Sequence, residues 1–522
     1  MKGTFRQSMD WLHGWSGLLL GGVLYFVFLT GTAGYADLEL DRWMMPERPN
    51  VADVETAISV ATAQAYLSKY AADADSWFIN PPGQRENPYL RVIWADRTNP
   101  GTGSRHTKFL DPITGEELVG RDTGGGQFLY RLHYKLHYMP VIAGIIIVGV
   151  ATMFMLVSLV SGVITHKRIF RDFFTFRPGA SQRAWLDAHN VLSVLTLPFQ
   201  IMITYSGLVF LAIYYMPLIV AGFYAGSDDP MQQYESEQYQ KSAPLERSGT
   251  PVPPIDFTPM ITAAESRWGE ETIRSISIDF PGDTARHITF AHHIRAPVNS
   301  AELLHFNADT GRLTGTTPRV TNAARGTFDG FLGLHEGLFA TPLVRWLYIL
   351  SGLAGAAMVS SGLILWTVKR RQNRRRRDQP ERDIEIVDRL NVAIVCGLPV
   401  ALAAYFWANR LIPTDFAERA AWEGHAIFIV WGLMAIHALN FPAKRGWYLQ
   451  CGFAAFAFGS IPIINLISTN RHLIASISQQ QWDLAAVDIT FILFGFGFAA
   501  ASLQLRARVN RRPIAAPCEV SG

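Results

Sequence analysis

Histidines beside long apolar segments are the residues of this sequence that point most directly to chemistry. The 522-residue chain has 14 histidines, and some of them lie at the ends of apolar stretches. An ionisable side chain at the edge of a membrane-spanning helix is costly, so it is a functional candidate by default. The six candidates are His13, His133, His137, His166, His189 and His335.

Two neutral imidazoles on facing helices can hold a haem iron through its axial positions. Gly14 and Gly17 follow His13, and small residues at such places leave room for the face of a porphyrin. The three cysteines lack the CxxCH spacing of covalent haem attachment. Carboxylates and cysteines are scarce near the candidates, which weakens zinc or copper as alternatives without excluding them. The residues therefore favour two non-covalent b-type haems.

Eight apolar stretches are long enough to cross a bilayer as helices, which takes about 20 residues each. Only 17% of the residues are charged, whereas soluble proteins average about 25%. The net charge of +3 does not indicate nucleic-acid binding. We therefore expect a mainly α integral membrane protein in a lipid bilayer. The stretches are 11–35, 138–164, 187–214, 342–367, 388–408, 422–441, 447–467 and 484–505.

Lysine and arginine cluster in alternate connections between these spans, at 165–183, 368–389 and 442–446 and in the C-terminal tail. The positive-inside rule places such loops in the cytoplasm. Both termini are then cytoplasmic, and the candidate histidines divide equally between the two faces. His13, His166 and His189 are expected at the cytoplasmic face, and His133, His137 and His335 at the trans face.

Two long polar segments lie on the trans side, at about 36–130 and 215–330. Each has an amphipathic stretch, then strand-like runs, then an Asp/Asn-to-Gly turn, which is hairpin chemistry. We therefore expect two small α+β lobes, each with one helix and its own antiparallel sheet.

The domain order follows from these segments. The predicted parts are a first transmembrane helix (1–36), lobe 1 (37–130), transmembrane helices 2–3 (131–214), lobe 2 (215–330), transmembrane helix 4 (331–368), a basic cytoplasmic loop (369–387), transmembrane helices 5–8 (388–506) and a cytoplasmic tail (507–522).

The order helix–lobe–helix occurs twice, which indicates an internal duplication. The spacing from His13 to Gly31 is 18 residues (31 − 13), and that from His189 to Gly207 is also 18 (207 − 189). The last four helices fall outside the repeat. The two copies are residues 1–168 and 180–370.

The repeat predicts which histidines meet. Two copies related by an axis normal to the membrane pair His13 with His189 inside and His133 with His335 on the trans side. His137 would share a helix face with His133 at i, i+4 and is the alternative trans ligand. On the inside the alternative ligand is His166, which aligns with Trp366 in the second copy and so breaks the repeat.

The segments WLHGWSGL, YRLHYKLH, WLDAHNVLS and LGLHEGLF, with the DPITG and ADTG turns, resemble the PepSY-associated transmembrane family over residues 5–370. The eight-helix length and the segment GVITHKRIFRDFFTFRP resemble ferrisiderophore reductases of the FoxB type. This resemblance implies a bacterial inner-membrane enzyme with two b-type haems and periplasmic PepSY-like lobes. It also implies electron transfer to a ferric siderophore in the periplasm.

The electron donor must come from outside the chain. No GxGxxG motif follows a strand, so there is no flavin or nicotinamide domain, and a quinol or a separate cytoplasmic reductase is expected. Two rival functions stay open: a PepSY-type binding or regulatory protein, and a siderophore permease with structural haem.

A ferric siderophore is too large to enter the helix bundle. The electron is therefore expected to leave at the lobe–helix junctions, around 127–138 and 328–339. Glycines at these junctions, such as Gly124–Gly126, permit close backbone approach.

Overall fold

The computed structural model divides the chain into two compact units. Unit 1 contains Met1–Pro46, Arg121–Leu208 and Arg345–Gly522, and unit 2 contains Glu47–Gly120 and Val209–Val344. The described residues are 4–50, 54–85, 87–95, 105–166, 173, 177, 181–239, 247–296, 301–319, 322–337 and 339–510. Three of the basic residues used for the topology (Lys167, Arg168 and Arg171) and the tail beyond Asn510 lie outside them.

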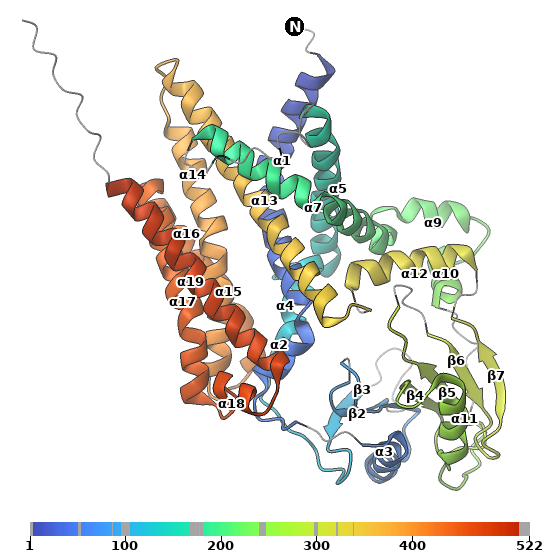
Figure 1. The fold of residues 1–522 in the computed structure, drawn as a ribbon. Coiled ribbons are helices and arrows are strands. Elements are labelled where there is room, and N and C mark those ends of the chain that lie inside the picture. The colour runs from blue at the N-terminus through green and yellow to red at the C-terminus, as the bar shows by residue number, and fades with distance from the viewer. Residues whose placement is uncertain are drawn as a thin grey trace, which may run out of the picture. The chain divides into compact units, whose positions relative to one another are not determined.

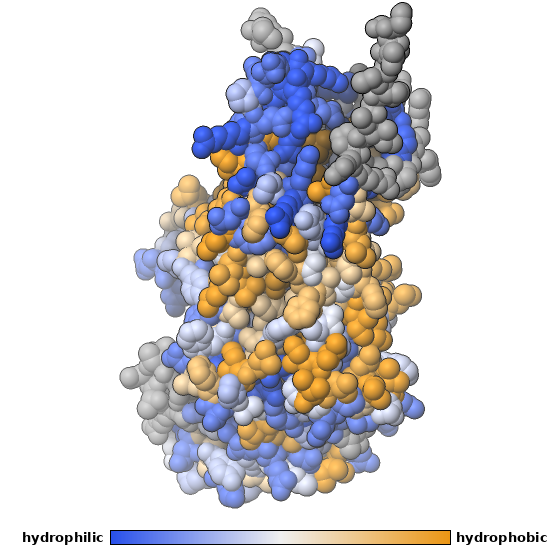
Figure 2. Space-filling model, turned by 90° about the vertical axis from the view of Figure 1, so that its left-hand side faces the viewer, coloured by the Kyte–Doolittle hydropathy of each residue, from blue (hydrophilic) through white to orange (hydrophobic). Residues whose placement is uncertain are grey.

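In the described part of the chain, eight helical segments are long and apolar enough to cross a membrane. They agree with the predicted spans to within a few residues, except that α13 continues further into basic sequence. Hydrophobic side chains gather along these helices in Figure 2. The chain is therefore a mainly helical multi-pass membrane protein (Figure 1). The segments are α1 (Phe5–Gly34), α5 (Val141–Thr165), α7 (Gln182–Phe210), α13 (Pro342–Arg375), α14 with α15 (Arg382–Val395 and Gly397–Leu411), α16 (Arg419–Asn440), α17 (Ala443–Ser468) and α19 (Trp482–Asn510).

The helices of the duplicated part pack closely because α13 presents glycines to its neighbours. A Cβ at Gly352 would lie 2.2 Å from the Thr32 hydroxyl of α1, and one at Gly355 would lie 2.5 Å from the Gln200 amide of α7. Such distances exclude any side chain at these positions. At these two glycines the backbone of α13 therefore contacts side chains of α1 and α7 directly.

Two of the last four spans, drawn in orange to red in Figure 1, also contact α1 directly. The Tyr25 hydroxyl donates to the carbonyl oxygen of Val395 at 2.9 Å, where α14 ends and α15 begins. The ring of Phe26 stacks on Trp431 of α16, with centroids 5.7 Å apart. The extra helices thus share a core with the helix that carries His13.

Two short helices of unit 1, α2 (Asp37–Met44) and α4 (Gly125–Lys135), lie where lobe 1 was predicted to begin and end. The backbone N–H of Gly126 donates to the Asp41 carboxylate at 2.8 Å. Gly125 has a φ of +61°, and a Cβ there would lie 1.9 Å from the same carboxylate. The glycine run is therefore needed for the contact between α2 and α4, independently of any role at the electron exit.

Unit 2 holds one seven-stranded antiparallel sheet with the strand order β3-β2-β1-β4-β5-β6-β7. The prediction of two separate sheets was wrong, because β1 and β4 pair directly, with Phe78 opposite Ser277. Pairing of these two strands removes an exposed edge from each half. The strands are β1 (Ser76–Asn80), β2 (Leu90–Ala95), β3 (Arg105–Leu110), β4 (Ile273–Asp279), β5 (His287–His292), β6 (Leu303–Phe306) and β7 (Leu313–Thr317).

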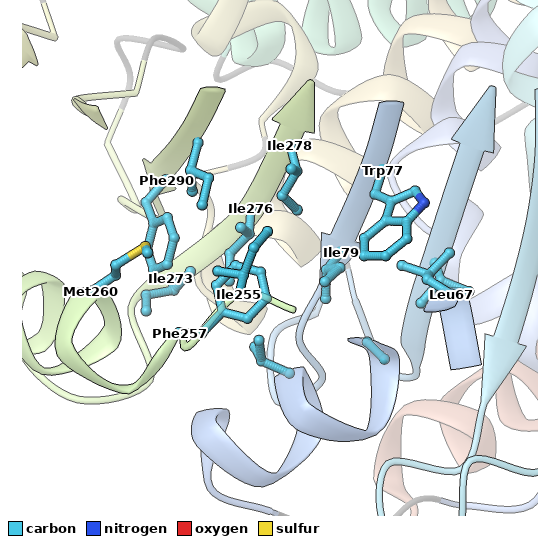
Figure 3. Close-up of a cluster of buried hydrophobic side chains, with 14 of the residues drawn as sticks. Leu67, Trp77, Ile79, Ile255, Phe257, Met260, Ile273, Ile276, Ile278 and Phe290 are labelled. Carbon is cyan, nitrogen blue, oxygen red and sulfur yellow. The ribbon is translucent and has the colours of Figure 1, made fainter. Parts of the chain in front are cut away.

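Helices α3 (Thr56–Tyr70) and α11 (Thr258–Trp268) pack on one face of this sheet. Figure 3 shows Trp77, Ile79 and Ile276 directed into the core between sheet and helices. Strand β7 was not predicted, since its sequence LTGTT is polar and mostly exposed. The remaining helices are α8 (Ala212–Tyr215), α9 (Pro217–Phe223), α10 (Pro230–Tyr239) and α12 (Ala323–Glu336) in unit 2 and α18 (Leu473–Ser478) in unit 1.

The predicted turns support the duplication. The side-chain oxygens of Asp111 and Asn307 each accept hydrogen bonds from the backbone N–H groups two and three residues later. The closing glycines have matching left-handed conformations, with φ of +73° at Gly115 and +66° at Gly311. Only glycine adopts such a φ without a steric cost, so both turns have the predicted chemistry.

Candidate cofactor site

His13 of α1 and His189 of α7 face each other inside unit 1. Their ring centroids are 6.3 Å apart, and the ring planes lie at 73° to one another. The start of α1 is fixed by a capping box between Thr4 and Gln7. The start of α7 is fixed by two hydrogen bonds from Arg177 to the buried Asp187 carboxylate, at 2.9 and 3.2 Å. The structure thus brings together the pair expected from the repeat.

Both rings bond to a backbone carbonyl of a neighbouring helix. Nδ1 of His13 lies 2.9 Å from the Ser158 carbonyl oxygen on α5, and Nδ1 of His189 lies 3.0 Å from that of Met358 on α13. A carbonyl oxygen only accepts, so each Nδ1 carries the proton and donates. The lone pair of each neutral ring therefore sits on Nε2, which is the usual arrangement of a metal-ligating histidine.

A serine and a glycine complete each setting at equivalent places. Ser161 lies beside Nδ1 of His13 at 3.4 Å, and Ser361 lies beside Nδ1 of His189 at 3.2 Å. Gly362 packs against His189 so closely that a Cβ would lie 3.2 Å from its Cε1, and the equivalent Gly162 has the same distance to His13. The repeated Ser-Gly pairs therefore hold the two rings in matching orientations.

The donor set fits a haem iron. A metal bonded to one nitrogen of each imidazole at about 2 Å would place the ring centroids roughly 6 Å apart, which matches the 6.3 Å between His13 and His189. Among the described residues, no hydrogen bond reaches Nε2 of either ring. A Cβ at Gly14 or Gly17 would meet nothing within 4 Å, so α1 offers open space beside His13.

His166 lies at the same end of the bundle. It is the residue that ends α5, and its backbone N–H donates to the Gly162 carbonyl at 3.1 Å. Burial lowers the pKa of His166, and the neighbouring His13 lowers it further. The three histidines predicted for the cytoplasmic face are therefore neighbours, with His166 as the outer member.

Basic side chains surround this cluster. Lys369 pairs with Asp10 of α1 at 3.7 Å. The guanidinium of Arg370 lies 4.3 Å from the ring centroid of Trp366 and 5.1 Å from that of Trp15. The positive charges of Lys369 and Arg370 favour binding of an anionic group, such as a carboxylate, near these histidines.

His133 has the same kind of setting at the other end of α1. Its Nδ1 lies 3.0 Å from the Val27 carbonyl oxygen, and its ring packs on Gly31, where a Cβ would lie 2.4 Å from Nδ1. The repeat-derived partner, His335 of α12, belongs to unit 2 and lies 6.1 Å from Phe210 between ring centroids. The pairing of His133 with His335 joins the two units and stays a prediction.

His137 does not share a helix face with His133, and that expectation was wrong. α4 ends at Lys135, and Leu136 and Tyr138 have positive φ values of 55° and 56°. The chain therefore turns before α5, and the His137 ring stacks on Phe428 of α16 at 5.3 Å. A non-glycine residue with positive φ is uncommon, so the turn cannot be read from the sequence.

The turn is held by a contact that the sequence did not reveal. The Tyr138 hydroxyl hydrogen bonds to Nδ1 of His425, and the two rings stack. The other histidine of α16, His437, lies 3.3 Å from the Gln450 amide. Both α16 histidines make these contacts with residues other than His13 and His189.

Two histidines of the unit 2 sheet, His106 and His292, stack on tryptophan rings. His106 stacks on Trp94 and His292 on Trp268, with centroids 5.0 and 4.7 Å apart. Across the described ranges, no group of three or more His, Cys, Asp and Glu residues is arranged to hold a metal ion.

A buried polar network at one end of the last four helices was missed. Arg419 and Glu423 of α16 are fully buried and paired. Glu423 also accepts from Asn409 at 2.7 Å and from the Gly124 N–H at 3.0 Å. The signal in the sequence is an Arg and a Glu four residues apart at the edge of an apolar span. The network joins α15 and α16 to the segment before α4.

Comparison with known proteins finds a family model that covers more than half of the chain. Residues 11–369 match the model of the family described as the PepSY-associated TM region. The uncharacterised protein PA4219 of Pseudomonas aeruginosa is 22% identical over 366 residues, which cover 67% of this chain and 88% of that protein. The matched family region contains all six candidate histidines and stops before α14.

Proposed function

This chain belongs to the PepSY-associated TM region family, and from that premise we propose that it is a haem-dependent ferric-chelate reductase. It would pass electrons across a bacterial inner membrane to a ferric siderophore or ferric chelate in the periplasm. Both termini and the basic loops would lie in the cytoplasm, and the sheet of unit 2 in the periplasm.

The observation that carries the proposal is the pair His13–His189. Two rings from different helices each donate from Nδ1 to a main-chain carbonyl oxygen, which leaves the lone pair on Nε2, and their centroid separation of 6.3 Å is that expected for two imidazoles on one iron atom. A histidine that only lies among the lipid headgroups in contact with water would not need a second histidine with the same hydrogen-bond arrangement. The duplication of the whole setting, with Ser161 and Ser361 in equivalent places, argues for a selected site.

Two b-type haems are proposed. The inner one would be held by His13 and His189, with His166 as the alternative ligand, and the outer one by His133 with His335. His137 is a weaker alternative, because its ring stacks on α16. Haem supplies one-electron redox chemistry. The chain's own residues fix ring orientation and proton position, and they keep water away from the ligands.

The donor would be a membrane quinol or a separate cytoplasmic reductase. The described connections on the basic side are short: α16 ends at Asn440 and α17 begins at Ala443, and α13 ends at Arg375 and α14 begins at Arg382. Neither connection has room for a nucleotide-binding domain. Basic residues near the inner histidines, such as Arg370, would meet acidic groups of a haem or of a partner.

The test is transfer of electrons to a chelate. Purified protein, reduced with dithionite and freed of excess reductant, is mixed with ferric citrate, and the haem absorbance and ferrous iron are followed. We expect the reduced bands to disappear as ferrous iron forms in equal amount. Bands that stay reduced in excess chelate would reject the reductase and favour a regulatory protein. Chelate uptake by proteoliposomes without any donor would favour a permease.

A further inference from the structure

One face of the unit 2 sheet carries clustered arginines. Trp77, Ile79 and Ile276 point toward α3 and α11, as Figure 3 shows. Side chains alternate between the faces along a strand. Phe78 and its cross-strand neighbour Ser277 therefore belong to the opposite face. We call the cluster on this opposite face, made by Arg91, Arg105 and Arg274, the arginine face.

The three arginines come from three strands, of which β2 and β3 are neighbours and β4 is separated from β2 by β1. Arg91 is on β2, Arg105 on β3, and Arg274 lies in the register shift of β4. The Arg105 guanidinium is 5.4 Å from the ring centroid of Phe78 on the strand between them. Burial lowers the pKa of Arg91, and the charges of Arg274 and Arg105 lower it further. Arg91 therefore lies within electrostatic range of both Arg274 and Arg105.

Among the described residues, no carboxylate pairs with the arginine face. The side-chain hydrogen bond there has an uncharged acceptor: Nε of Arg91 donates to the Asn80 amide oxygen at 3.1 Å. The acidic residue on the same strand as Arg274, Asp279, lies five positions along β4, about 17 Å away. Other arginines of unit 2 are paired: Arg267 with Glu302 at 2.6 Å, Arg286 with Asp309 at 2.7 Å and Arg247 with Asp75 at 3.1 Å.

We propose that the arginine face binds an anionic ferric chelate, whose carboxylate or phenolate oxygens accept the guanidinium N–H groups. Guanidinium forks match planar oxygen pairs, and an anion lowers the repulsion between like charges that have no paired carboxylate. Phe78 and Ile93 add apolar contact on the same face. The identity of the ligand rests on the proposed reductase function.

The experiment measures binding without redox chemistry. Full-length protein in phosphatidylcholine nanodiscs is titrated calorimetrically with gallium(III) citrate, which has the charge and shape of the ferric complex but is not reduced. We expect Arg105→Gln to weaken binding about tenfold, or about 1.4 kcal/mol. Arg105 is exposed, so this variant should fold. The triple variant R91Q/R105Q/R274Q should bind no measurable gallium citrate. The control Arg312→Gln, in the exposed turn before β7, should bind like the wild type.

The proposal is overturned if folded Arg105→Gln and the folded triple variant bind as tightly as the wild type. It is also overturned if wild-type binding does not weaken as salt is raised, because exposed charges are screened. Loss of binding in phosphatidylglycerol nanodiscs would assign the face to lipid headgroups instead. Haem content is measured on the same samples. A lack of chelate binding at the arginine face can therefore be distinguished from a lack of haem.

Discussion

At the residue scale, the candidate site depends on which ring nitrogen of each histidine is already hydrogen bonded. His13, His189 and His133 all direct Nδ1 at a backbone carbonyl of a neighbouring helix. The sequence indicated these residues through their spacing in the repeat. The sequence did not indicate the hydrogen-bond acceptors, because Ser158 and Met358 accept through main-chain carbonyl oxygens, which every residue has. The sequence-based prediction also misplaced His137, because the residue types around Leu136 do not reveal its positive φ.

Gly362 provides a residue-scale test of the inner site. A Cβ there would lie 3.2 Å from Cε1 of His189, so Gly362→Val should push the ring from its present position. Overpacking of this kind costs about 1–3 kcal/mol, and we expect haem to pass to apomyoglobin about tenfold faster than from the wild type. The control is Gly432→Val on α16, where a Cβ would meet nothing within 4 Å. Equal rates for both variants would argue against His189 as a ligand.

At the element scale, length and hydropathy were sufficient to locate the eight spanning helices, since a bilayer sets one minimum length for all of them. The pairing of β1 with β4 could not be located in this way. It joins segments nearly 200 residues apart, and each half-sheet is by itself compatible with a separate lobe. The end of α4 at Lys135 was missed because the residues that follow are compatible with a helix.

The α2–α4 contact predicts a pH dependence of stability. Burial and, to a smaller extent, the neighbouring Asp37 raise the pKa of Asp41 from 3.8 to about 7, although the Gly126 N–H opposes the shift. The folded state therefore holds a proton that the unfolded state releases near pH 4. Stability should fall as pH rises from about 4 to about 7, by up to about 1.4 kcal/mol per unit, and then level off.

Asp41→Asn tests this dependence. The apparent melting temperature of the wild type should fall between pH 5 and pH 7 relative to that of the variant. The two curves should run parallel above about pH 7.5. A wild-type curve parallel to that of Asp41→Asn throughout would mean that Asp41 is ionised in the folded protein.

The Arg419–Glu423 pair predicts a large stability effect. Both side chains are fully buried, and removal of one member leaves an uncompensated buried charge, which costs about 3–5 kcal/mol. We expect Glu423→Gln to lower the melting temperature far more than Glu418→Gln, which changes an exposed residue of the same helix start. The double variant R419M/E423L should lose less than Glu423→Gln alone. Similar melting temperatures for the two single variants would contradict a structural role for the pair.

At the scale of the whole molecule, the protein combines two copies of a repeat that contributes spanning helices and sheet strands with four further helices. The duplication is visible in the sequence, in the turns at Gly115 and Gly311, and in the matched settings of His13 and His189. The four further helices lie beyond the matched family region, yet they pack on α1 through Tyr25 and Phe26. We therefore expect them to stabilise α1, the helix that carries His13.

The haem content of purified protein tests the central claim most directly. Bis-histidine ligation predicts about two non-covalent haems per chain in the wild type and about one in His189→Ala, because the outer site does not use that residue. The control His437→Ala, on α16 beside Gln450, should keep about two. A folded wild-type protein without haem, or a His189→Ala variant with undiminished haem, would contradict the account.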